Sequence, residues 1–139
     1  MLTARHVMRQ PVHMVHGLDS VAHAVRLMHM RGVSSLLVPP HLEGEGYGII
    51  TKADVVAKVV AQGRDPLRVR VSEVMTKPVH TVEPDCSLRE CAALMMRYRI
   101  RRLPVFAGSW PAPVGIVSDS DVFDMLLNFH TEAAASFSL

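Results

Sequence analysis

The segment Gly48-Ile49-Ile50-Thr51-Lys52-Ala53-Asp54-Val55 occurs a second time as Gly115-Ile116-Val117-Ser118-Asp119-Ser120-Asp121-Val122. Each copy begins with apolar β-branched residues, which are typical of a buried strand. A hydroxyl residue follows, and then an aspartate before a new apolar run. This order predicts a strand, a helix N-cap and a helix. The chain therefore contains the same strand-to-helix motif twice.

The offset of 67 positions between the two copies holds along most of the chain. The same shift aligns Val7-Met8 with Val74-Met75, Pro11-Val12-His13 with Pro78-Val79-His80, and Leu27-Met28 with Leu94-Met95. A constant register over this length indicates a duplication. We therefore expect one compact pseudo-symmetric domain, with a first unit at residues 1–67 and a second at residues 68–139.

Composition excludes several classes of protein. With 139 residues, of which 49% are hydrophobic, the chain can bury a real core. The net charge of +2 is too small to indicate nucleic-acid binding by itself. Cys86 and Cys91 have neither zinc-site nor disulfide-framework spacing, and they fit a reducing compartment. The start lacks a signal-like apolar region and no apolar run is long enough to span a membrane, so we expect a cytoplasmic protein.

The order of elements predicts an α/β (α+β) fold. In the first half we expect a strand at 11–15, a helix from Asp19 or Ser20 to Gly32, a strand at 34–38, the motif strand and a last helix. Each unit is thus β-α-β-β-α, and the second half repeats this order up to a helix that ends near Asn128. The segment 67–74 has valines alternating with polar residues, which predicts an extended strand.

The chain resembles the cystathionine β-synthase (CBS) domain. The residues that carry the resemblance are Met75-Thr76-x-Pro78-Val79, Leu103-Pro104-Val105, and Gly-Ile-[Ile/Val]-[Thr/Ser]-x-x-Asp in both halves. Two such units in tandem are similar to a CBS pair, or Bateman module, over essentially the whole chain. The first half departs from the pattern at Leu37, where the second half has Pro104.

This resemblance implies two units packed sheet to sheet, with clefts between the halves that bind an adenosine-containing ligand. The candidate ligands are AMP, ADP, ATP and S-adenosylmethionine, and no cofactor is required. The resemblance also implies a regulatory sensor that assembles as a homodimer through its helices. Apolar positions on the helix after the first motif, Val55, Val56, Val59 and Val60, would support this dimer.

The resemblance places the ribose-binding carboxylates at Asp54 and Asp121. A carboxylate at the end of a strand can accept charge-assisted hydrogen bonds from both vicinal ribose hydroxyls. Thr51 and Ser118 lie three residues earlier and can contact ribose or phosphate. The alternative is that these hydroxyls only cap the following helix, with each aspartate complementing the helix dipole. The two interpretations are compatible.

Charges near the two motifs differ. Lys52 adjoins the first carboxylate region, whereas Asp119 adds an anion to the second, so we rank the Asp54 site above the Asp121 site for a phosphorylated ligand. In similar CBS pairs the positions before the Leu103 strand line a cleft and can serve the half that carries the other aspartate. Arg101 and Arg102 match them, and Ser34 and Ser35 are their first-half equivalents. Arginine suits phosphate because its planar fork donates two hydrogen bonds.

His13 and His80 occupy the first strand of each half, where similar domains present their backbone to adenine. Their side chains are more typical of ordinary, partly buried histidines. No Cys/His cluster has metal-ligand spacing, so no metal site is predicted. Gly-rich phosphate loops and the common hydrolase and metalloprotease motifs are also missing, which argues against an enzyme and predicts no catalytic residues.

The leading hypothesis is a stand-alone regulatory CBS pair that binds an adenine nucleotide and signals by a population shift, through its dimer or a protein partner. One alternative is a dimerisation or interaction scaffold that binds no ligand. Another is a nucleic-acid-binding module that uses the arginine run from Arg97 to Arg102. For Arg97 and Arg99 we prefer a structural role as cations at a helix end.

Overall fold

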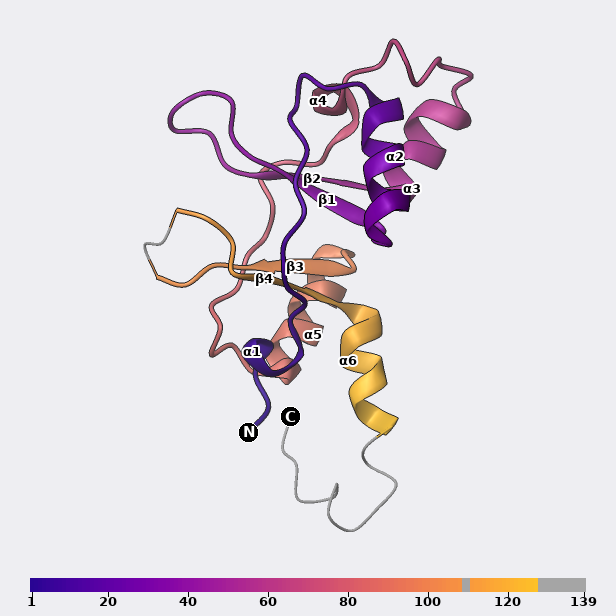
Figure 1. Cartoon of the computed structure of the whole chain (residues 1–139). Helices are drawn as coiled ribbons and strands as arrows, with labels where there is room; N and C mark the ends of the chain where they lie inside the picture. The colour runs from indigo at the N-terminus through magenta and orange to yellow at the C-terminus, as the bar shows by residue number, and fades with distance from the viewer. Residues whose placement is uncertain (109–110, 128–139) are drawn as a thin grey trace. The chain divides into compact units, whose positions relative to one another are not determined.

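The computed structural model describes residues 1–108 and 111–127. The chain forms two compact units (Figure 1). We call His13–Val79 the continuous unit, and Met1–Val12 together with His80–Leu139 the split unit. The predicted boundary between residues 67 and 68 separates the sequence repeats, whereas the spatial units divide elsewhere. The difference arises because the leading segment of each repeat packs with the body of the other repeat.

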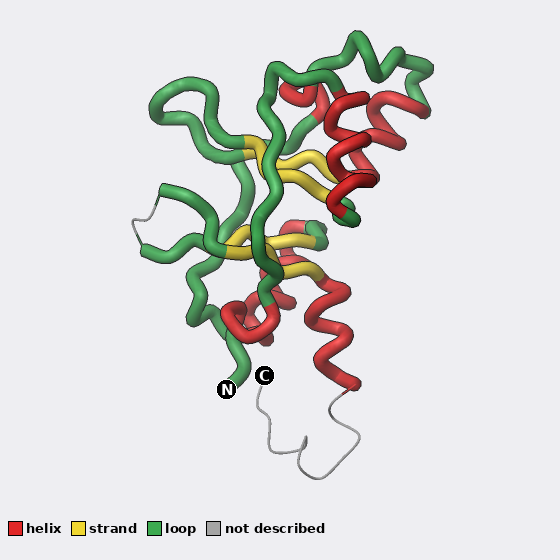
Figure 2. Tube along the Cα trace, viewed as in Figure 1, coloured by secondary structure: helices red, strands yellow, loops and turns green. Residues whose placement is uncertain are grey.

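The continuous unit is built on a two-stranded antiparallel sheet (Figure 2). Strand β1 (Ser35–Val38) pairs with β2 (Gly48–Thr51), and Leu36 lies opposite Ile50. Its helices are α2 (Val21–Arg31), α3 (Lys52–Val55), the π-helical segment η1 (Val56–Val60) that continues α3, and α4 (Val71–Val74).

The split unit repeats this arrangement. Strand β3 (Arg102–Val105) pairs antiparallel with β4 (Gly115–Ser118). Its helices are α1 (Ala4–Val7), α5 (Leu88–Tyr98) and α6 (Asp119–Met125). The predicted class, mixed helix and strand in two similar units, is therefore confirmed. The predicted end of the last helix, Asn128, lies outside the described residues, and within those residues no helix is long and apolar enough to cross a membrane.

The first strand of each unit is reduced to a single parallel bridge, Met14 with Leu37 and Val82 with Val105. The two bridges use different donors. In the continuous unit the Leu37 N–H donates to the His13 carbonyl at 3.0 Å. Pro104 stands in the equivalent place and has no N–H, so the split unit uses the Phe106 N–H, which donates to the Val82 carbonyl at 3.0 Å.

The predicted extended strand over 67–74 was wrong, because residues 71–74 form α4. Val71 and Val74 are one helical turn apart and are both buried, so a helix buries them on one face. Glu73 begins this helix by accepting a hydrogen bond from the Arg70 N–H at 2.7 Å, which lowers the pKa of the Glu73 carboxyl. Alternating valines fit both periods, and the cap selects the helix.

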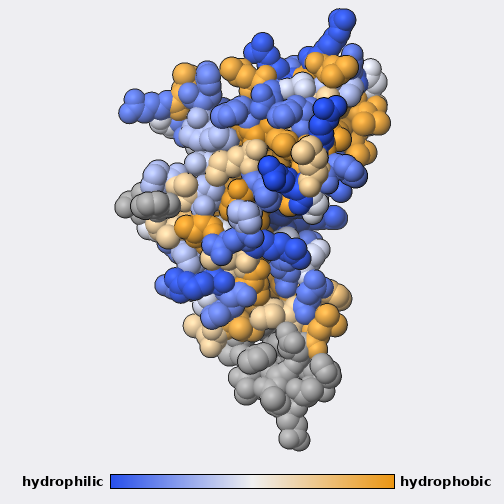
Figure 3. All heavy atoms as spheres, viewed as in Figure 1, coloured by the Kyte–Doolittle hydropathy of each residue, from blue (hydrophilic) through white to orange (hydrophobic). Residues whose placement is uncertain are grey.

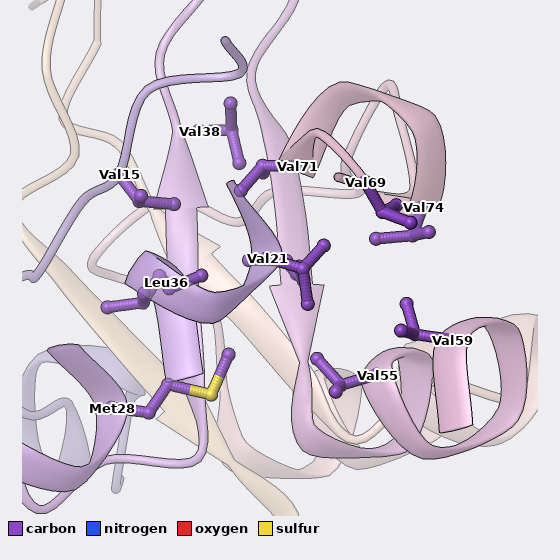
Figure 4. Packing of buried hydrophobic residues seen from close by; sticks show 12 residues of the cluster. Val15, Val21, Met28, Leu36, Val38, Val55, Val59, Val69, Val71 and Val74 are labelled. Atoms are coloured by element: carbon purple, nitrogen blue, oxygen red, sulfur yellow. The ribbon is translucent and has the colours of Figure 1, made fainter. Parts of the chain in front are cut away.

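The core of the continuous unit is made of valines and a few larger side chains (Figure 4). Leu36 and Val38 of β1 belong to one cluster with Val21 and Met28 of α2, and valines of α3, η1 and α4 are part of the same cluster. Val55 and Val59 belong to this core, so their predicted place on an exposed dimer face was wrong. The split unit has a matching cluster that includes Ala4, Val82, Cys91, Leu103 and Val117.

Each motif strand has its second edge paired by the leading segment of the other repeat. Ile49 of β2 and Thr76 exchange two backbone hydrogen bonds of 2.9 Å, and Ile116 of β4 and Arg9 exchange bonds of 2.8 and 3.2 Å. A methionine from the same segment covers the motif glycine. A Cβ added to Gly115 would lie 2.5 Å from the Met8 Sδ, so this contact requires glycine.

The long helix of each unit ends in a left-handed residue. Gly32 has φ 64° and ends α2 as predicted, whereas its repeat counterpart Arg99 has φ 54° at the end of α5. A left-handed conformation is unstrained for glycine and costs other residues about 1 kcal/mol or more. The split unit therefore carries local strain at Arg99.

Fragments of equal length can test the exchanged segments. We expect a peptide of residues 13–79 to show more helical circular dichroism and a more cooperative thermal transition than a peptide of residues 1–67. The reason is that residues 13–79 contain the whole core cluster, whereas 1–67 lacks Val69, Val71 and Val74. A more ordered 1–67 fragment would contradict this assignment of the units.

Replacing Arg99 by glycine should stabilise the protein. We expect Arg99→Gly to raise the free energy of unfolding by about 1 kcal/mol, because glycine adopts the left-handed conformation without strain. Gly32→Ala is the matched control and should lower stability by a similar amount. Urea denaturation of both variants measures the effect, and a destabilised Arg99→Gly would show that the Arg99 side chain makes a larger contribution than the strain.

Candidate functional site

The motif of the continuous unit is a reciprocal helix cap. The Asp54 N–H donates to the Thr51 Oγ1 at 3.1 Å, and the Thr51 N–H donates to the Asp54 Oδ2 at 3.0 Å. This capping box satisfies two of the backbone donors at the start of α3. The predicted cap is thus confirmed, and it holds the carboxylate of Asp54 in one orientation.

Lys58 neutralises this carboxylate. Its Nζ lies 3.2 Å from the Asp54 Oδ1 and donates a hydrogen bond of 2.9 Å to the carbonyl oxygen of Val74. The Asp54 side chain is 15% exposed. Lys52, the cation predicted to influence this site, is an exposed residue whose backbone N–H donates to the Ser34 carbonyl at 3.0 Å. The ion-pair partner of Asp54 is therefore Lys58.

The motif of the split unit is held more tightly. The Asp121 N–H donates to the Ser118 Oγ at 3.1 Å, while the Asp121 Oδ2 accepts from the Ser118 N–H at 3.1 Å and from the Ser118 hydroxyl at 2.7 Å. The Asp121 side chain is only 7% exposed. Asp121 is the one buried charged residue in the part of the chain that the structure describes.

Arg9 neutralises Asp121. Its Nε donates to the Asp121 Oδ1 at 2.7 Å, and 72% of the arginine side chain remains exposed. The hydrogen bond and the charge of Asp121 raise the pKa of the Arg9 guanidinium. A buried carboxylate needs such a partner, because an unpaired charge is costly to remove from water. The leading segment thus contributes a functional group to the second motif.

In the folded chain the two sites do not differ in charge in the way that the sequence predicted. Each carboxylate has a basic partner, Lys58 for Asp54 and Arg9 for Asp121. Asp119 is exposed and accepts a hydrogen bond from the Ser120 N–H at 2.8 Å. The number of acceptor sites left on each carboxylate differs more than the charge. Asp121 accepts three hydrogen bonds, whereas Asp54 has one partner on each oxygen.

Other predicted residues lie beside the motif of their own unit. In the continuous unit Ser35 pairs with Thr51 across the sheet, and Ser34 precedes it. In the split unit Arg102 pairs with Ser118, and the Arg101 carbonyl accepts a hydrogen bond from the Asp119 N–H at 2.9 Å. Each unit thus gathers its own predicted polar residues at the strand ends. That Arg101 and Arg102 contact a ligand bound by the unit with the other aspartate stays a prediction.

The two predicted histidines differ in their surroundings. The His13 carbonyl accepts the Leu37 N–H described above. The His80 carbonyl receives no such ladder bond among the described residues, because Pro104 lacks the donor. The ring of His80 stacks on Tyr98, with 3.7 Å between centroids and 12° between planes. His80 is nevertheless an exposed residue, unlike the partly buried His13, so its predicted partial burial was wrong.

The sequence pattern predicted neither Lys58 nor Arg9 as a site residue. Lys58 lies four residues after Asp54 on one helix, and this spacing is a recognised ion-pair signal. Arg9 lies 112 residues from Asp121, so no local pattern could connect them. The residue at the equivalent position of the second repeat is Thr76, so comparison of the two repeats did not mark Arg9 as a site residue either. Among residues 1–108 and 111–127 no group of His, Cys, Asp and Glu could hold a metal ion.

Comparison with known proteins identifies relatives of this chain. It is 37% identical over 98 residues to the uncharacterized protein MK0525 of Methanopyrus kandleri, covering 70% of this chain and 49% of that relative. The chain spans about half the length of this relative and of a mitochondrial CBS domain-containing protein of Arabidopsis thaliana.

Two solved structures have the same fold. A hexameric CBS-CP12 protein from bloom-forming cyanobacteria has a TM-score of 0.85 and 37% identity, and the match covers 100% of this chain and 76% of that one. The CBS domain pair of protein MJ0100, solved with 5′-methylthioadenosine and S-adenosylmethionine, has a TM-score of 0.79 and 25% identity, with 93% and 98% coverage.

The family model of the CBS domain matches residues 4–61 and again residues 71–128. The two matches are offset by the same 67 positions as the sequence repeat, and each contains one copy of the duplicated motif. On this evidence the chain belongs to the CBS domain family and contains two CBS domains.

Proposed function

We propose that this CBS pair is a regulatory module that binds an adenosine-containing ligand and signals by a change in conformation, without chemistry on the ligand. The ligand class is AMP, ADP, ATP or S-adenosylmethionine. The related MJ0100 pair was solved with two adenosine compounds, which supports this class. Catalysis plays no part in the proposal, because the site chemistry described above is that of hydrogen bonding and charge neutralisation.

The proposal rests on the hydrogen-bonding capacity of the Asp54 carboxylate. A carboxylate has about four lone-pair sites, and the two described partners of Asp54 occupy one on each oxygen. Two sites remain for the vicinal hydroxyls of a ribose. The side chain is already oriented by the helix cap, so binding costs little ordering.

Asp121 is the weaker ribose acceptor in this proposal. Three hydrogen bonds occupy its carboxylate, and its side chain is less exposed than that of Asp54. A ribose there would have to displace Arg9 or Ser118 from the carboxylate. The preference for Asp54 thus keeps the ranking made from the sequence but rests on acceptor sites and exposure.

A second candidate function is an assembly scaffold. Val56 and Val60 of η1 are 60% and 65% exposed, and hydrophobic residues reach the surface in several places on the face seen in Figure 3. In the split unit Met96 and Phe123 are exposed on α5 and α6. The CBS-CP12 relative is hexameric, which supports self-association. We propose that a second copy of this chain covers Val56 and Val60.

Calorimetric titration with AMP, ADP, ATP and S-adenosylmethionine tests the ligand proposal. We expect Asp54→Asn to weaken binding about tenfold or more, because it removes a charge-assisted acceptor worth about 1.5 kcal/mol or more. Asp121→Asn is the matched control and should have the smaller effect. A larger loss in Asp121→Asn would overturn the ranking, and heats of dilution alone for all four ligands would contradict ligand binding.

Light scattering at several concentrations tests the assembly proposal. We expect the wild-type chain to form a dimer or larger assembly and Val56→Lys with Val60→Lys to shift it toward the monomer, because two cations cannot be buried in an apolar contact. Lys substitution at Ala57, which is also exposed on η1, is the control. A double variant that assembles as well as the wild type would exclude this face as the interface.

A further inference from the structure

Cys86 and Cys91 form a close thiol pair at the start of α5. Cys86 directly precedes the N-cap Ser87, and Cys91 is the fourth residue of the helix. Side chains at these two positions commonly pack together at helix starts. The two Sγ atoms lie 3.6 Å apart, and both cysteines are free thiols. The geometry therefore holds two sulfurs in contact across the beginning of one helix.

The two thiols differ in their access to solvent. Cys91 is completely buried in the core cluster of the split unit, whereas Cys86 is half-buried. The first repeat has Asp19 and Ala24 at the equivalent positions, and Ala24 is as fully buried as Cys91. Packing at this helix start thus does not require a cysteine. The pair is a feature of the second repeat alone.

We propose that Cys86 and Cys91 are a redox modification site at which a low-molecular-weight disulfide, such as oxidised glutathione, closes an intramolecular disulfide. The Cys86 thiolate attacks one glutathione sulfur, and the other glutathione leaves as a thiolate that takes up a proton. The Cys91 thiolate then attacks the Cys86 sulfur and releases the second glutathione. The two protein thiols are oxidised to one disulfide, and the glutathione disulfide is reduced to two thiols.

The order of attack follows from exposure, since only Cys86 is accessible to an oxidant in solution. Burial raises the pKa of Cys86 and raises that of Cys91 to about 12. The thiolate fraction is therefore small at neutral pH, and the bond forms slowly. Because the thiolate is the nucleophile, the rate rises with pH. The contact between the sulfurs makes the second step intramolecular and favours closure over a lasting glutathione adduct.

The disulfide would link the residue before the N-cap of α5 to the first turns of that helix, where the leading segment of the first repeat is hydrogen-bonded. The Ala4 N–H donates to the Cys86 carbonyl at 2.8 Å, and the Leu88 N–H donates to the Leu2 carbonyl at 3.1 Å. Oxidation would thus act where residues 2–4 are hydrogen-bonded to the start of α5 within the split unit. Both cysteines belong to the split unit, whereas Asp54 belongs to the continuous unit.

The test is oxidation of the folded chain with oxidised glutathione at about pH 7 and about pH 9, followed by acid quench, alkylation and intact-mass measurement. We expect the wild type to lose two hydrogen atoms in mass and to take up no alkyl group. Reaction should be faster at the higher pH, and dithiothreitol should restore both thiols. Cys91→Ala reproduces the residue of the first repeat, so it should fold, and it should stop at a glutathione adduct on Cys86.

Cys86→Ser should leave Cys91 unmodified in the folded chain, because no accessible thiol remains. Three results would overturn the proposal: a wild type that stops at the glutathione adduct, a disulfide formed between two chains, or oxidation that occurs only in urea. Non-reducing electrophoresis separates the second result from the intramolecular bond. The same oxidation in urea provides the unfolded reference.

Discussion

The structure depends on the backbone pairing between each motif strand and the leading segment of the other repeat. One edge of β2 is paired by β1, and its other edge is paired at Ile49 by Thr76. Ile116 and Arg9 form the equivalent contact on β4. A repeat without the exchanged segment would expose an unpaired strand edge, so each repeat relies on the other for this pairing. Each of the two units is therefore completed by residues from both repeats.

The same pairing determines the electrostatics of the site. Because Arg9 pairs with Ile116 through its backbone, its side chain reaches Asp121 in the first turn of α6, the helix that follows this strand. The continuous unit has threonine at this position and neutralises Asp54 from its own helix with Lys58. Two copies of one motif thus reach neutrality in different ways. Asp121 has one polar contact more than Asp54 for a separate reason, because the Ser118 hydroxyl also donates to it.

The helix cap and the candidate site are the same set of atoms. The side chains of Thr51 and Ser118 begin their helices by accepting a hydrogen bond from the aspartate N–H. Each aspartate carboxylate in turn accepts a hydrogen bond from the backbone N–H of the cap residue. The competing interpretations of this motif, structural cap and ligand site, are therefore not exclusive. The cap fixes the orientation of the carboxylate, and an oriented carboxylate is what a ribose would require.

Local patterns predicted much of the fold, including the motif strands, their caps and the C-terminal Gly32 of α2. The predicted strand over 67–74 was wrong because the spacing of its valines fits both a strand and a helix. Val55 and Val59 were misplaced because an apolar face does not reveal whether a core or a partner covers it. The amino-acid sequence was enough to predict the duplication, the capped strand-to-helix motifs and the family, because these signals join residues close in the chain or repeat at one offset. The pairing of leading segments with units, and of cations with aspartates, emerged only from the folded chain. Arg9 meets Asp121 across 112 positions through packing that no local pattern encodes.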